Sequence, residues 1–141
     1  MTKYFEVPMI SAEAAMQLVT AVIKDGQQRG LSFAVTVVDP SLRLVAFCRG
    51  DKANPLAVES TRRAAQTALV DDRASGWMPL ESSVVLALAS GNSTTNVTGG
   101  VPIRFGGLLV GALAVGGEHP DDNAAAATAA LESIGADVIA P

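Results

Sequence analysis

GGVPI at residues 99–103 opens the most informative stretch of this sequence, which continues through Gly106-Gly107 into LLVGALAVGG at residues 108–117. The apolar runs on either side of Gly106-Gly107 predict a β-hairpin, because two adjacent glycines readily take the positive φ angles of a two-residue turn. The glycines that frame the hairpin allow a sharp turn or a close approach of the backbone to a ligand. We expect Gly100 in particular to have a positive φ or to lie against a ligand.

The residues before the hairpin predict helices that alternate with strands. Ser11 is a suitable N-cap for a helix that ends at Gly30, and Met16 falls on its expected apolar stripe. Residues 31–38 are continuously apolar and β-branched, which predicts a central strand covered on both faces. Asp39-Pro40-Ser41 is a turn sequence that leads into a second strand over residues 42–48.

Three further helices are expected. Asn54-Pro55 favours a helix start, with Leu56 among the apolar side chains of that helix. Residues 80–89 predict a short helix closed by Gly91, although residues 84–86 also suit a strand. A last helix is expected over residues 121–138. Hairpins joined by helices predict an antiparallel sheet with helices on its faces.

Composition narrows the class of protein. A chain of 141 residues predicts one domain over residues 1–141. The net charge of −4, without a basic stripe, argues against a nucleic-acid partner. The single Cys48 excludes an internal disulfide, and no signal peptide or membrane-length apolar run is recognised, so we expect a cytoplasmic protein without a membrane partner. Abundant Ala, Val and Gly with few charges predict a homo-oligomer.

Several short motifs together resemble one protein family. VVDP at residues 37–40, RGD at residues 49–51, GGVPI and the later Asp122 match, in order and spacing, the GlcG/HbpS family. This family is domain of unknown function 336, related to the C-terminal part of PduO-type corrinoid proteins. The resemblance spans about residues 33–131 and implies a profilin-like α/β/α sandwich with a central antiparallel sheet, which assembles into multimers. Its members are linked to haem binding or degradation, to corrinoid metabolism and to small organic acids.

Haem is therefore one candidate ligand. The side chains that could ligate its iron are those of His119, Cys48, Tyr4 and four methionines. We expect Met16 and Cys48 to lie in the core and His119 to cap the last helix beside Pro120. Binding of haem without a strong axial ligand stays open, since its propionates can pair with arginine. No spacing typical of a metal site, a catalytic nucleophile or a dinucleotide-binding loop is present.

A small organic acid is the other candidate ligand, because arginine is the main basic residue. Arg49 with Asp51 is the expected acid-recognition pair, and Glu118 and His119 are candidate proton donors and acceptors. The expected ligand contacts are Gly99, Gly100, Arg104, Thr95, Asn96, Trp77 and Asp122. We expect the pocket between the sheet, residues 71–98 and a neighbouring subunit. The sequence thus predicts a protein that binds haem, another tetrapyrrole or a small organic acid. The alternative is a cofactor-independent isomerase or lyase acting on a small acidic or aromatic metabolite.

Overall fold

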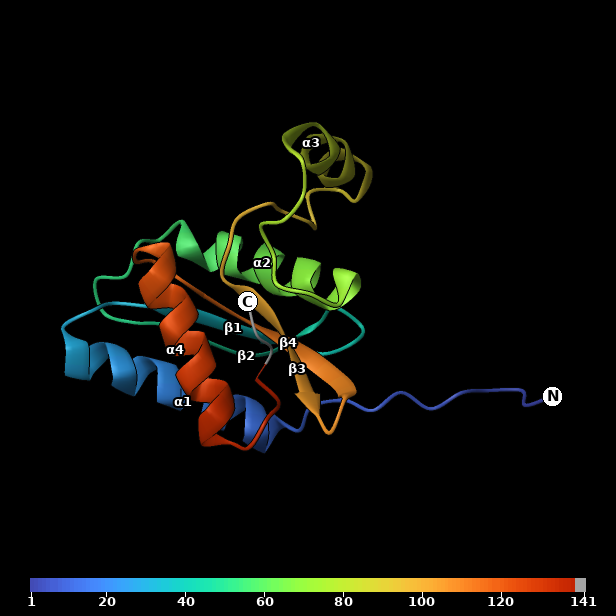
Figure 1. Cartoon of the computed structure of the whole chain (residues 1–141), viewed down its shortest axis with the longest axis horizontal. Coiled ribbons are helices and arrows are strands. Elements are labelled where there is room, and N and C mark those ends of the chain that lie inside the picture. The colour runs from blue at the N-terminus through green and yellow to red at the C-terminus, as the bar shows by residue number, and fades with distance from the viewer. Residues whose placement is uncertain (139–141) are drawn as a thin grey trace.

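The computed structural model describes residues 1–138, which form a sheet of four antiparallel strands between helices (Figure 1). The elements along the chain are α1 (Ala12–Arg29), β1 (Ala34–Val38), β2 (Leu44–Arg49), α2 (Ala57–Asp71), α3 (Leu80–Ala89), β3 (Gly100–Phe105), β4 (Leu108–Gly116) and α4 (Pro120–Ser133). The strand order is β2-β1-β4-β3. Helices α1 and α4 cover one face of the sheet and α2 covers the other, so the expected α/β/α sandwich is confirmed.

The strand β1 is buried along its whole length, as its continuous apolar sequence predicts. Val35 and Val37 face the core under α1 and α4, whereas Val38 belongs to a second cluster under α2. That second cluster is built mainly from alanines of α2 and β4, so helix and sheet lie close together. Within it, the buried hydroxyls of Thr36 and Thr61 are hydrogen-bonded at 2.8 Å.

The helix α1 has the predicted ends but a different buried face. The Ser11 hydroxyl accepts a hydrogen bond from the Ala14 amide, and Gly30 ends the helix with φ 69°. The buried stripe is Ala15, Leu18, Val22 and Gly26. Met16, which we expected in the core, is 64% exposed, because a residue one position after Ala15 is turned about 100° away from this stripe.

The predicted hairpin is confirmed as β3 and β4. Gly106 and Gly107 have φ 59° and 83°, and their amides donate hydrogen bonds of 3.0 and 2.7 Å to the Asp137 carboxylate. The expectation of a positive φ at Gly100 is wrong, since the neighbouring Gly99 has it instead, at 115°. Gly100 lies in β3, where a Cβ atom would come within 2.1 Å of the Ala64 carbonyl oxygen of α2.

Two predicted helix boundaries are wrong. The helix α2 begins at Ala57, because the Asn54 side chain accepts a hydrogen bond from the Leu56 amide in a turn before the helix. Leu56 is consequently 77% exposed instead of buried. The helix α4 ends at Ser133, shortly before Gly135 with its φ of 74°, and does not reach residue 138.

Two segments stand away from the sandwich. Residues 1–9 run outward as an arm without helix or strand, and their side chains are exposed. The helix α3, which includes residues 84–86, also stands clear of the other elements (Figure 1). Its flanking loops are held to the body by short contacts, including the Ser75 hydroxyl with the Gly100 amide and the Thr67 hydroxyl with the Thr95 amide, both at 2.9 Å.

Candidate functional site

One end of the sheet gathers the residues expected to carry acid–base chemistry. Arg49 ends β2 and Asp51 follows it, whereas Glu118 and His119 follow β4. The segment before β1 connects these two loops. The Gly50 amide donates to the Phe33 carbonyl, and the Ser32 amide donates to the Glu118 carboxylate, each at 2.8 Å.

These residues do not line a common hollow. Asp51 lines a hollow of about 430 Å³ beside the C-terminal part of α1. Glu118 lines another of about 170 Å³, together with Thr61 of α2 and Thr98. Arg49 and His119 line neither of these hollows. Neither of these two hollows is therefore lined by an acid, a base and an arginine of this set together.

The role of His119 as a helix cap is confirmed. Its Nδ1 atom accepts a hydrogen bond of 3.2 Å from the Asp121 amide at the start of α4, and its side chain is 68% exposed. Asp122, in the first turn of α4, forms an ion pair of 3.3 Å with Arg29 of α1. Both side chains thus have structural contacts at the point where α4 meets the end of α1.

Several arginines form ion pairs with carboxylates of the same chain. Arg104 pairs with Asp72, and the side chains of Arg62 and Arg63 both contact the carboxylate of Glu59. The hydrogen bond from Arg62 is the main reason that the pKa of Glu59 lies below its ordinary value. Arg49 forms no ion pair with another residue of the range 1–138.

The other expected ligand contacts hold residues 71–98 in place. The Asn96 side chain bonds both the amide and the carbonyl of Met78, at 2.9 and 2.7 Å. The indole of Trp77 donates to Asp71 at 3.2 Å and stacks under the guanidinium of Arg73, 4.2 Å from the ring centre. The carbonyl of Gly99 accepts a hydrogen bond of 3.1 Å from the Val115 amide.

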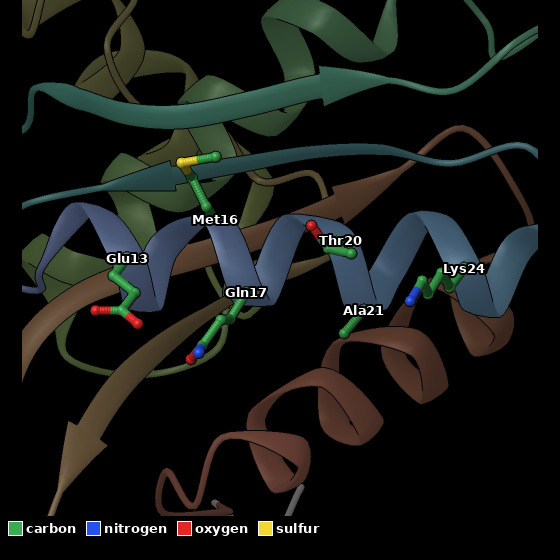
Figure 2. Close-up of a pocket in the computed structure, with 6 residues that line it drawn as sticks. All are labelled: Glu13, Met16, Gln17, Thr20, Ala21 and Lys24. Atoms are coloured by element: carbon green, nitrogen blue, oxygen red, sulfur yellow. The ribbon is translucent and has the colours of Figure 1, made fainter.

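The largest of the described hollows lies elsewhere, along α1. It has a volume of about 720 Å³ and is open to solvent. The residues that line it, which we call the α1 groove, are Glu13, Met16, Gln17, Thr20, Ala21 and Lys24. Figure 2 shows these side chains along α1, with Met16 projecting from the helix.

The α1 groove has a neutral middle and one charge at each end. Glu13 and Lys24 carry the only charges of the groove and are eleven residues apart, which corresponds to about 16 Å along a helix. Met16, Thr20 and Ala21 provide the uncharged surface between them. Sequence reasoning missed this surface because it assigned Met16 to the core. The signal was nevertheless present, since these residues recur at helical spacing beside the buried stripe.

Neither a cluster of metal ligands nor a membrane-spanning helix occurs among residues 1–138. Within residues 1–138, no group of three or more His, Cys, Asp or Glu side chains converges to hold a metal ion. In the same part of the chain, no helix has the length and apolar character needed to span a bilayer.

The sheet order, with two helices on one face and one on the other, defines a small α/β/α sandwich of antiparallel strands. The chain belongs to the HbpS-like family, whose model, described as haem degrading protein HbpS-like, matches residues 10–132. The resemblance found in the sequence motifs is thereby confirmed.

Individual relatives agree with this assignment. Protein GlcG of Escherichia coli strain K12 is 27% identical over 108 residues, which are 76% of this chain and 81% of GlcG. The crystal structure of HbpS has a TM-score of 0.82 at 25% identity, covering 94% of this chain and 95% of HbpS. The crystal structure of a PduOC–heme complex has a TM-score of 0.80 at 21% identity, covering 92% and 97% of the two chains, and shows the shared fold.

Proposed function

We propose that this protein binds haem or a closely related tetrapyrrole, with one face of the ring lying along the α1 groove. The observation that carries the proposal is the exposed side chain of Met16 on a stretch of α1 that is uncharged between Glu13 and Lys24 and borders an open hollow. The family described as haem degrading and the relative solved with heme support this choice of ligand.

The residues of the groove fit haem in their chemistry. Methionine sulfur is an accepted axial ligand of haem iron, and the Met16 side chain is not committed to the core. Cys48 is only partly exposed and packs against the core, and His119, whose Nδ1 atom caps α4, does not line the groove. Among the residues that line the groove, Met16 is the one whose side chain is an accepted ligand of haem iron.

The remaining groove residues would orient the ring. Ala21 and Thr20 have small, uncharged side chains, on which a planar molecule can lie. The ammonium of Lys24 at one end attracts a propionate, whereas the carboxylate of Glu13 repels one at the other end. Bound haem would supply a redox-active iron, and the chain's part is to hold the ring, select its direction and shield one face from water.

The cofactor-independent isomerase or lyase is not favoured by the geometry. Such an enzyme needs its acid, its base and its anion-binding group around one substrate. Asp51 and Glu118 line separate hollows, and the Glu118 carboxylate already accepts the Ser32 amide.

The proposal is tested by titrating hemin into the purified protein and recording the Soret band. We expect saturable binding, and we expect Met16→Leu to shift the Soret band and to weaken binding about tenfold, which corresponds to about 1.4 kcal/mol. Leucine keeps the apolar bulk and removes only the sulfur. Met9→Leu, which changes another exposed methionine outside the groove, is the matched control and should bind like the unchanged protein.

Identical spectra and affinities for Met16→Leu and the unchanged protein would contradict the proposed iron ligand. Absence of saturable hemin binding by the unchanged protein would contradict the proposed function as a whole. A small carboxylic acid that binds instead, with a loss of affinity in Arg49→Ala, would assign the protein to organic acids.

A further inference from the structure

The hollow of about 430 Å³ has no part in the proposed haem site. It lies between the C-terminal end of α1 and the turn that follows β2, and we call it the turn hollow. Its apolar lining includes Ile23, Leu31 and Phe33, and its two charged side chains are those of Asp51 and Lys52. It shares no lining residue with the α1 groove.

The two charges of the turn hollow are adjacent in sequence and opposite in sign. Within residues 1–138, neither Asp51 nor Lys52 forms an ion pair. A simple carboxylate in the hollow is attracted by Lys52 and repelled by Asp51, and a simple amine meets the reverse. A small molecule that carries both an ammonium and a carboxylate group can pair with both side chains.

The backbone at Lys52 has a conformation that lysine rarely adopts. The Ala53 amide donates to the Gly50 carbonyl at 3.0 Å, so residues 50–53 form a β-turn, and Lys52 at its third position has a φ of 66°. Glycine is favoured at such a position. The turn is fixed at both ends, since the Gly50 amide donates to the Phe33 carbonyl and Ala53 is buried. A lysine in a strained and fixed turn beside a hollow indicates a use for its side chain.

The end of α1 adds a preference for a cation. The Leu31 amide donates to the Gly26 carbonyl, and the Ser32 amide donates to the Glu118 carboxylate. The carbonyls of residues 27 and 28 therefore lack the amides that would continue the helix, and they lie at the negative end of the helix dipole. Gln27 lines the turn hollow, so this end of α1 reinforces the negative charge of Asp51.

We propose that the turn hollow binds a small α-amino acid with an apolar side chain. The ammonium group lies between Asp51 and the end of α1, and the carboxylate pairs with Lys52. The apolar side chain lies against Ile23, Leu31 and Phe33. This site is separate from the α1 groove, and the proposal does not depend on haem binding.

The first test compares an amino acid with its two halves. In isothermal titration calorimetry, L-leucine or L-valine should bind saturably. Isocaproate, which is leucine without its amino group, and isoamylamine, which is leucine without its carboxylate, should each bind at least about tenfold more weakly than leucine. In NMR spectra of the ¹⁵N-labelled protein, leucine should shift the amide signals of Gly30, Leu31 and residues 50–52.

The second test separates ligand binding from a structural role of the turn. Lys52→Gly should weaken leucine binding at least about tenfold, while its melting temperature stays the same or rises, because glycine accepts the positive φ. Asp51→Asn, which keeps the shape of the side chain and removes its charge, should also weaken binding. The matched control is Asn92→Gly, since Asn92 has a φ of 63° and lies outside the turn hollow. This control should bind leucine like the unchanged protein.

Four results would overturn the proposal. The first is the absence of saturable binding of both leucine and valine. The second is isocaproate or isoamylamine binding as tightly as leucine, which would make the hollow a site for a simple anion or a simple cation. The third is unchanged leucine affinity in a folded Lys52→Gly variant. The fourth is a set of leucine-induced NMR shifts centred on the α1 groove instead of the turn hollow.

Discussion

Single residues determine how closely the layers of this sandwich approach. At Gly100 the backbone of β3 passes so near to α2 that a Cβ atom would lie 2.1 Å from the Ala64 carbonyl oxygen and 3.0 Å from the Ser75 hydroxyl. The Gly100 amide also donates to that hydroxyl. A glycine is therefore needed at this position because of the close packing. The backbone conformation of Gly100 would by itself accept other residues.

We predict that Gly100→Ala lowers the free energy of unfolding by about 1–3 kcal/mol, because the added methyl group forces α2 away from the sheet. Thermal or urea unfolding measures this effect. Gly91→Ala provides a comparison, because Gly91 has a positive φ of 66° but open space around its Cβ position. Any loss of stability in that variant reports backbone strain alone, whereas the loss in Gly100→Ala reports the clash with α2. A Gly100→Ala variant with unchanged stability would show that α2 does not lie this close to the sheet.

At the scale of elements, the turn between β1 and β2 shows how a short polar sequence orders a hairpin. The Asp39 carboxylate accepts hydrogen bonds from the Ser41 amide, at 2.8 Å, and from the Ser41 hydroxyl. It also accepts from the Arg43 amide, at 3.3 Å. The hydroxyl of Ser41 is the main cause that lowers the pKa of Asp39. A carboxyl group whose pKa is lowered by folding stabilises the protein above its unfolded pKa, and this contribution is lost as the pH falls through the folded pKa.

We predict that Ser41→Ala raises the pKa of Asp39 toward its ordinary value, as measured by NMR titration of the side-chain carboxyl carbon. The variant should lose stability at neutral pH, where Asp39 is ionised in both states, and should match the unchanged protein once the carboxyl is protonated in both. Ser133→Ala, which removes a hydroxyl that bonds only a helix carbonyl, should leave the Asp39 titration unchanged. An Asp39 pKa that does not respond to Ser41→Ala would contradict the assigned cause.

Most elements could be predicted from the sequence because their signals are local. The cap at Ser11, the glycine at position 30 and the Gly106-Gly107 turn act within a few residues, and all three have the expected roles. Local signals do not, however, predict which face of α1 is buried against the sheet. Met16 and Leu18 are both apolar, and only packing against the sheet buries Leu18 and leaves Met16 exposed.

The candidate site was harder to predict for the same reason. Arg49, Asp51, Glu118 and His119 lie near one end of the sheet, since strand ends and helix starts bring them there. Which hollow each side chain lines depends on contacts between distant residues, such as the Ser32 amide with Glu118. Those contacts are not encoded in any local motif.

At the scale of the whole molecule, the sandwich carries two separate surfaces with uncovered apolar groups. The α1 groove lies on one of the helices that cover the sheet, whereas α3 stands apart on the side of α2 (Figure 1). We assign the groove to a flat ligand.

The most direct test of the central claim is to locate bound haem by NMR. Backbone amide resonances of the ¹⁵N-labelled protein are recorded with and without ferric haem, whose unpaired electrons broaden nearby signals. We predict that broadening is centred on residues 13–24 of α1, with Met16 among the most affected, while residues around His119 and Cys48 remain visible. Broadening centred on His119, on Cys48 or on the Arg49–Asp51 loop would contradict the claim that haem lies along α1.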